Sequence, residues 1–424
     1  MRHTLAALLA VFVLGTPWFA FNYPTQFRYV TDAIVGAGEQ IAAIILAHNP
    51  KSVADIQAKY VAGTISSQTK VRVLIVPGHE PDYGGAEYRS SFGYLKERDL
   101  TVELGEDLQQ LLAQDPHYQV FIARDTHSWD PVFADYFGRG WDGIVAWERA
   151  HKQEVMNLIS LGRYRVEAPP VYHNSVPDNV AMHLYGMGKW ANENDIDIII
   201  HVHFNDYPGH GAAPGKYSGF AIYVPEDQYD NSTTTHAVAD SIFKRLAKYN
   251  PVSDFKPEKA GIVEDPDLIA LGAYNSIDAA SMLIEYSYLY EPQIGNPATH
   301  ATFLKELAYE TYLGLQDFFE PAKATQLANA YDTLWLPYHW DKAITDKNQS
   351  SADVYALQTA LTFDGEYPPA GKGKNDCPRT GGFGPCTKAA LEAFQNRFGI
   401  TGEKGMVGAK TLDALNQQFG AKVI

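Results

Sequence analysis

Short apolar runs and longer helical patterns alternate along the middle of the chain. Apolar runs at residues 71–76, 120–123, 196–204 and 282–286 are bounded by turn residues and predict buried strands. Between the first two runs, residues 97–112 repeat leucine at helical spacing, which predicts a helix with one buried face. Helices that lie between strands indicate an α/β domain with a largely parallel or mixed sheet flanked by helices.

The N-terminal end has a different pattern. An apolar run over residues 4–21 follows Arg2 and His3, which is typical of a signal peptide or a membrane anchor. A signal-peptidase site of the Ala-x-Ala kind is not evident, so a cleaved signal and a retained anchor both stay open for residues 1–21. In either case we expect an exported protein of the periplasm or cell envelope. Residues 22–70 predict a helical and linker segment.

The rest of the chain divides into segments that differ in their hydrophobic pattern and composition. Residues 71–319 carry the α/β pattern, with an insertion at about 126–190 that is rich in aromatic residues and too long for a plain loop. Residues 320–350 resemble a connector, and residues 351–424 predict a small helical module. The insertion contains three tryptophans, Trp129, Trp141 and Trp147. They either line a groove for a glycan or form a small core of the insertion itself.

Length and charge narrow the choice of function. A chain of 424 residues is expected to hold two domains and connecting segments. Its formal net charge of -16 argues against a nucleic-acid partner, which would favour a basic surface. The only cysteines, Cys377 and Cys386, suggest a local disulfide in an exported protein and lie far from the α/β pattern, so a thiol nucleophile is not expected.

Two candidate metal ligands lie at the ends of predicted elements. His79 follows the strand at 71–76, and ligands in open α/β sheets gather beyond the C-terminal ends of strands. Glu97 lies on the same face as the leucine stripe of its helix, where an unpaired carboxylate would be costly and a cation is a good partner. The alternative for Glu97 is a first-turn glutamate favoured by capping and by the helix dipole.

A second pair of candidates lies within strands. His201 and His203 alternate along one strand and so share a face, where they either bind a metal or are hydrogen-bonded. Glu285, inside an apolar run, fits a general base near a metal-bound water, the alternative being an ion pair with a Lys or Arg. Two histidines and one carboxylate would leave a fourth zinc position for water.

At these residues the sequence resembles the zinc-dependent N-acetylmuramoyl-L-alanine amidases with a His-Glu-His metal site, over about residues 71–319. The motifs that carry the resemblance are Val76-Pro77-Gly78-His79-Glu80, Glu97-Arg98-Asp99-Leu100, Ala123-Arg124-Asp125, His201-Val202-His203-Phe204-Asn205 and Ile284-Glu285-Tyr286-Ser287-Tyr288. The sequence departs from the family where Val76 replaces an Asp and Glu80 replaces a Gly.

The resemblance implies roles for four residues. His79, Glu97 and His203 would bind Zn2+, and the family motif selects His203 over His201. Glu285 would activate the water. The bond hydrolysed by this zinc-activated water would join the lactyl group of N-acetylmuramic acid to the L-alanine of the stem peptide of peptidoglycan.

The C-terminal module resembles the three-helix peptidoglycan-binding domain. It contains a faint internal repeat, in which Leu357-Gln358 corresponds to Phe394-Gln395. In each half, a glycine-rich turn precedes a threonine, Thr387 or Thr411, which suits the start of a helix. The resemblance makes peptidoglycan the expected partner, and a Cys377–Cys386 bridge would pin the unusual insertion within the module.

Two other functions stay open at this point. One is a non-catalytic wall-binding or regulatory protein with a degenerate amidase domain, and the other is a zinc endopeptidase of the stem peptides. The new amine released from peptidoglycan distinguishes amidase from endopeptidase. His210 approaches the site from its loop or is simply exposed.

Overall fold

The computed structural model describes residues 48–63, 69–172, 176–207, 213–322, 331–345 and 350–421. The predicted signal or anchor at 1–21, most of the segment at 22–70 and His210 lie outside these residues. Within them, no helix is both long enough and apolar enough to cross a membrane.

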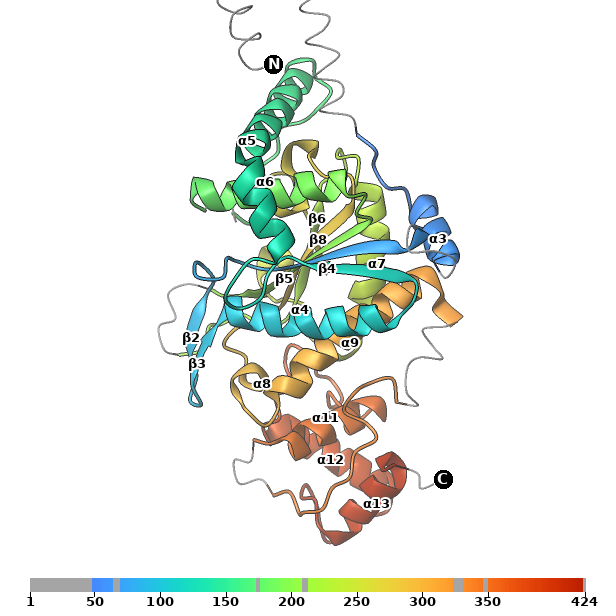
Figure 1. Ribbon diagram of the computed structural model, residues 1–424. Coiled ribbons are helices and arrows are strands. Elements are labelled where there is room, and N and C mark those ends of the chain that lie inside the picture. Colours follow the sequence, from blue (N-terminus) through green and yellow to red (C-terminus); the bar gives the residue numbers. More distant parts are fainter. Residues whose placement is uncertain are drawn as a thin grey trace, which may run out of the picture.

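A six-stranded mixed sheet forms the centre of the molecule (Figure 1), and its strand order is β4-β1-β5-β8-β6-β7. The first four strands are parallel, β6 is antiparallel to β8, and β7 is parallel to β6. The strands are β1 (Val71–Pro77), β4 (Tyr118–Ile122), β5 (Ile198–Asn205), β6 (Ala221–Pro225), β7 (Ile262–Asp265) and β8 (Ala280–Tyr288). The predicted α/β architecture with a mixed sheet is confirmed.

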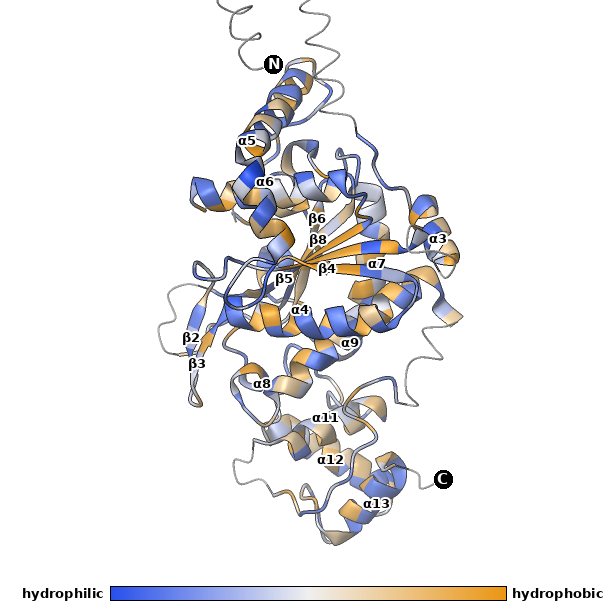
Figure 2. Cartoon of the chain, in the orientation of Figure 1, coloured by the Kyte–Doolittle hydropathy of each residue, from blue (hydrophilic) through white to orange (hydrophobic). Residues whose placement is uncertain are grey.

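Helices cover both faces of this sheet. The helices are α4 (Glu97–Gln114), α7 (Ser232–Tyr249) and α9 (His300–Phe319) on one face, and α5 (Pro131–Ser160) and α6 (Asp178–Glu193) on the other. Side chains of β1 alternate between the two cores, since Val73 and Ile75 join the α4 side while Leu74 and Val76 join the α5 side. Both faces are therefore apolar, as the strand colours show (Figure 2).

The smaller elements lie around the edges of the sheet. They are α3 (Val53–Ala62), the hairpin β2 (Glu87–Arg89) and β3 (Tyr94–Lys96), the 3-10 turns η2 (Lys256–Glu258), η3 (Ile269–Leu271) and η4 (Ala273–Asn275), and α8 (Pro292–Gly295). The α5 and α6 helices occupy most of the expected insertion. Trp147 is buried in the core beneath them, with Ile144 and Tyr185.

The C-terminal module consists of α11 (Ala352–Phe363), α12 (Pro385–Arg397) and α13 (Ala409–Phe419). Its sequence repeat has a structural reason. The buried amide of Gln358 donates to Thr387 and accepts from the backbone of Gly381, and the amide of Gln395 likewise donates to Thr411 and accepts from the backbone of Gly405. Each glutamine thus fastens one glycine-rich turn to the helix that follows it.

The module is docked firmly on the α9 side of the sheet. Trp335 and Trp340 of the preceding segment are buried in a core that continues into the module. Arg379 is fully enclosed and pairs with Glu306 of α9, with 3.1 Å between Nη2 and Oε2. The disulfide between Cys377 and Cys386 is present and fixes the segment that carries Arg379.

Candidate metal centre

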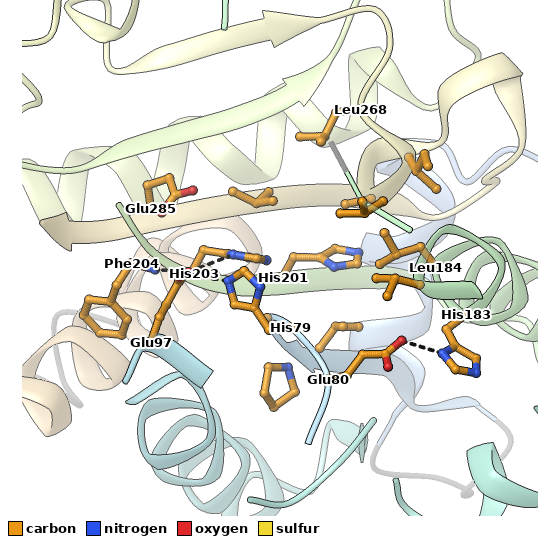
Figure 3. Close-up of a pocket in the computed structure, with 18 of the residues that line it drawn as sticks. His79, Glu80, Glu97, His183, Leu184, His201, His203, Phe204, Leu268 and Glu285 are labelled. Carbon is orange, nitrogen blue, oxygen red and sulfur yellow. Dashed lines mark hydrogen bonds and ion pairs between the residues drawn. The ribbon is translucent and has the colours of Figure 1, made fainter. Parts of the chain in front are cut away.

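Three of the predicted side chains meet at the C-terminal edge of the sheet (Figure 3). His79 lies in the turn after β1, Glu97 is the first residue of α4, and His203 lies near the end of β5. Since β1 and β5 are parallel neighbours, their C-terminal ends lie at the same edge of the sheet. Each of the three residues offers one ligand atom, and these atoms all lie within 4.8 Å of one another.

The donor set fits a divalent metal such as zinc. His79 Nε2 lies 2.8 Å from Glu97 Oε2, yet the pair is not aligned for a hydrogen bond, and this buried nitrogen has no hydrogen-bond partner among the described residues. His203 Nδ1 lies 3.1 Å from Glu97 Oε1. Two imidazole nitrogens and a carboxylate oxygen that converge in this way are a common zinc ligand set with one position left open.

Glu97 is held as a carboxylate facing the histidines. Only 4% of the residue is exposed, and the backbone N–H groups of Ala86 and Phe204 donate to its two oxygens at 2.9 and 3.1 Å. Burial alone would raise the pKa of Glu97, but the charge of His79 and the hydrogen bond from His203 outweigh it, so the pKa is lowered. The group is therefore ionised, as a metal ligand must be.

The turn that carries His79 is shaped by its sequence. His79 has a φ of 67°, which is uncommon for a residue with a side chain. Gly78 before it lies against the His203 ring, because an added Cβ would come within 2.4 Å of His203 Cε1. A glycine is therefore required at this position for the two histidines to approach each other.

Arg124 supports this turn from below. The residue is almost completely buried, and its guanidinium donates to the carbonyl oxygens of His79 (2.8 Å) and Arg98 (2.9 Å), and also to that of Gly78. Burial lowers the pKa of Arg124 to about 10, which leaves it charged at neutral pH. Sequence reasoning placed Arg124 only in a family motif and did not foresee that it holds the turn of His79 to the start of α4.

Glu285 lies next to His203 across the sheet, since the two residues pair in register between β5 and β8. It is 7% exposed, and its Oε2 is buried with no hydrogen-bond partner in the described part of the chain. Burial raises the pKa of Glu285 well above its ordinary value, and the charges of Glu97 and Glu258 add to the effect. No lysine or arginine forms an ion pair with it among the described residues, so the ion-pair alternative finds no support.

His201 shares a strand face with His203 but is engaged elsewhere. Its ring hydrogen-bonds the Ala270 backbone, and burial together with the charge of His203 lowers the pKa of His201 to about 3. It lines the same pocket but does not belong to the cluster of three ligand atoms. The ring is therefore a neutral part of the pocket wall.

The cluster of candidate metal ligands opens into a pocket of about 280 Å³ between the sheet edge and the insertion. One wall is apolar and comes from α6 and the η3 region, with Val180, Leu184, Met187, Leu268 and Ile269. At its rim, His183 Nδ1 lies 2.6 Å from Glu80 Oε1 (Figure 3). Trp129 and Trp141 each place a ring 5.3 Å from that of His183. Sequence reasoning missed His183, because its approach depends on how α6 folds back over the sheet.

Comparison with known families gives two matches within the chain. Residues 73–317 match the N-acetylmuramoyl-L-alanine amidase family, and residues 350–415 match a peptidoglycan binding domain family. The first match covers more than half of the chain and contains the three residues of the cluster and their neighbour Glu285. No curated protein matches the chain in sequence.

Solved structures of low sequence identity are similar to the chain. The CwlD amidase of Clostridioides difficile, solved in complex with the GerS lipoprotein, is 14% identical with a TM-score of 0.38, and the match covers 59% of this chain and 100% of that one. The amidase Ami1 of Mycobacterium smegmatis is 13% identical with a TM-score of 0.37, covering 59% and 97%. The amidase AmiC2 of Nostoc punctiforme is 14% identical with a TM-score of 0.35, covering 59% and 97%.

Proposed function

The chain belongs to the N-acetylmuramoyl-L-alanine amidase family, which hydrolyses the amide bond between N-acetylmuramic acid and L-alanine in peptidoglycan, and we propose that it does so with zinc held by His79, Glu97 and His203. The observation that carries the proposal is the convergence of these three side chains on one point beside Glu285. The second matched family makes peptidoglycan the partner of the C-terminal module as well. The protein thus works at the cell wall, and residues 1–21 would direct its export.

The chain's own residues account for the proton transfers of the reaction. A bound zinc ion would polarise the amide carbonyl and lower the pKa of a water molecule. Glu285 takes a proton from the attacking water as the water oxygen bonds to the lactyl carbonyl carbon. When the C–N bond breaks, Glu285 gives this proton to the amine nitrogen of L-alanine. Its raised pKa suits a group that must hold the proton between these two steps.

The pocket wall supplies the means of positioning the stem peptide. Its apolar side, from Val180 to Met187 on α6, suits the methyl groups of alanine residues, and His183 with Glu80 offers polar partners at the rim. These contacts would hold the amide against Glu285 and the metal ligands.

Digestion of purified peptidoglycan tests the function directly. The full chain with added zinc is expected to release stem peptides whose new N-terminal residue is L-alanine, which end-group labelling and mass spectrometry identify. New amines on cross-link residues would instead make the enzyme an endopeptidase. If no amine is released while the protein still sediments with the wall, the protein is a non-catalytic wall binder.

The role of Glu285 is tested by Glu285→Gln, which keeps the shape of the side chain and removes the base. We expect kcat to fall by about 10³-fold, within the range for loss of a general base, while the zinc content is unchanged. Glu264→Gln is the matched control, because Glu264 is an exposed strand carboxylate outside the pocket. If both variants retain the full rate, Glu285 is not the base.

A further inference from the structure

A second group of metal-ligand side chains lies away from the pocket. His48, His151 and Glu154 each offer one ligand atom, and these atoms lie within 4.8 Å of one another. None of the three residues lines the pocket that contains His79 and His203.

The three side chains come from two distant parts of the chain. His151 and Glu154 lie on α5 at a spacing of three, which places both on one face of the helix. His48 belongs to the segment that enters the catalytic domain. The imidazole rings of His48 and His151 meet edge to face, with 5.2 Å between their centroids. Residues about a hundred positions apart in sequence therefore converge on one point.

Two of the donor atoms in this group have no hydrogen-bond partner among the described residues. His151 is 2% exposed, and its Nδ1 forms no hydrogen bond with any described residue. Glu154 Oε2 is likewise buried and unpartnered within the described chain. Buried polar atoms are normally satisfied, so a buried nitrogen and a buried carboxylate oxygen left without partners need a ligand to explain them. A cation satisfies both.

His48 is oriented as metal-binding histidines usually are. Its Nδ1 lies 3.1 Å from the carboxylate of Asp278, a buried residue just before β8. With Nδ1 engaged in this way, the opposite ring nitrogen, Nε2, is the atom that would bind a metal, and the carboxylate would fix the ring and its tautomer. Asp278 is itself held in place, because its backbone N–H donates to the side chain of Asn192 at 3.0 Å.

We propose that His48, His151 and Glu154 bind a second divalent transition-metal ion of the zinc class, with Asp278 orienting His48. Two nitrogens and one carboxylate oxygen suit zinc better than calcium or magnesium, which prefer oxygen ligands alone.

The second ion has a structural role. Asp278 precedes β8, whereas Glu285 lies towards the other end of that strand, so the two metal clusters lie at opposite ends of the sheet. The ion would tie the incoming segment at His48 to α5. Since α5 packs on α6, and α6 forms the apolar wall of the pocket, the ion would hold the insertion in place over the active site.

Metal counting on the full-length, untagged protein tests this proposal. Purified without chelators, the wild-type chain is expected to carry about two zinc ions, measured by plasma mass spectrometry. Glu154→Gln and His48→Gln, which change the second site with little change in size, are each expected to lose one ion. The double variant His79→Ala/His203→Ala is expected to keep one ion, and the exposed His339→Gln is the control that keeps both.

The outcomes separate this site from the catalytic one. If the wild type carries one ion that the His79/His203 variant loses and Glu154→Gln keeps, the second site does not exist and the proposed function stands. If the single ion is lost by Glu154→Gln instead, the second site stands and the zinc assignment at His79 fails. In the His79/His203 variant, added zinc is expected to raise Tm, and this shift should vanish when Glu154→Gln is also present.

Discussion

At the scale of single residues, the candidate active site depends on a turn at His79 that is held by side chains from other parts of the chain. His79 has left-handed backbone geometry, and Gly78 lets the His203 ring approach. The Arg124 guanidinium donates hydrogen bonds to carbonyl oxygens of this turn and of the first turn of α4. The planar fork of arginine donates to several acceptors at once, which an ammonium group cannot reproduce with the same geometry.

We therefore expect Arg124→Lys to weaken zinc binding although the charge is kept. A loss of supporting contacts around metal ligands typically costs about 10- to 100-fold in metal affinity or activity. Competition with a chromophoric chelator measures the affinity, and peptidoglycan digestion measures the rate. Arg89→Lys, on the exposed hairpin strand β2, is the control. Equal affinities for Arg124→Lys and the wild type would show that Arg124 serves only the fold.

The sequence contains enough information to predict four residues of the candidate site but not the side chains that surround them. His79 and Glu97 are marked by their places at the ends of a strand and of an apolar helix stripe, and Glu285 is marked as a charge inside an apolar run. The choice of His203 over His201 needed the family resemblance. The contact between His183 and Glu80, and the cluster around His151, depend on how α5 and α6 fold back, which no local pattern records.

At the scale of elements, the four strands with long apolar runs are predictable and two short ones are not. β7 has only four residues, two of them acidic, and β6 lies between a glycine-rich loop and Pro225, so both resemble loops in sequence. They become strands because β6 pairs with the edge of β8, and β7 pairs in turn with β6. Tertiary pairing, rather than local propensity, decides their structure.

The α5–α6 contact makes an element-scale prediction about two helical glycines. Gly186 lies against α5, where an added Cβ would come within 2.9 Å of both Ile144 and Phe137. Gly186→Ala is therefore expected to lower the free energy of unfolding by about 1–3 kcal/mol through overpacking. Gly138 lies on the exposed face of α5, and no atom lies within 4 Å of an added Cβ. Gly138→Ala is therefore expected to raise the free energy of unfolding by about 0.5–1 kcal/mol. Urea unfolding compares the two, and changes of the same sign would contradict the close packing of α5 on α6.

At the scale of the whole molecule, the C-terminal module shares a core with the catalytic domain. The enclosed pair of Arg379 and Glu306 lies at their junction, and Glu306 also accepts a hydrogen bond from Thr333 at 2.8 Å. Tyr355 of α11 packs against Phe303 of α9. These contacts join the two domains more closely than the expected connector at 320–350 would suggest.

The junction predicts that the two domains unfold together. Arg379→Met removes one partner of the enclosed pair and leaves the Glu306 carboxylate buried, which is expected to cost about 3–5 kcal/mol. Arg397→Met removes a partly exposed arginine that pairs with Asp364 inside the module, and is expected to cost no more than about 1 kcal/mol. Denaturant unfolding followed by tryptophan fluorescence measures both. Two separate transitions in the wild type would contradict the shared core.

This fixed junction has a consequence for how the enzyme moves over its substrate. A flexible linker would let a catalytic domain reach many bonds around the point where the binding module is attached to the wall. A catalytic site and a binding site held rigidly together cannot do this. They gain avidity only where two positions in the wall match their spacing and orientation. We therefore expect each binding event to expose one amide bond to the pocket, so that cutting along a strand requires release and rebinding at a new position.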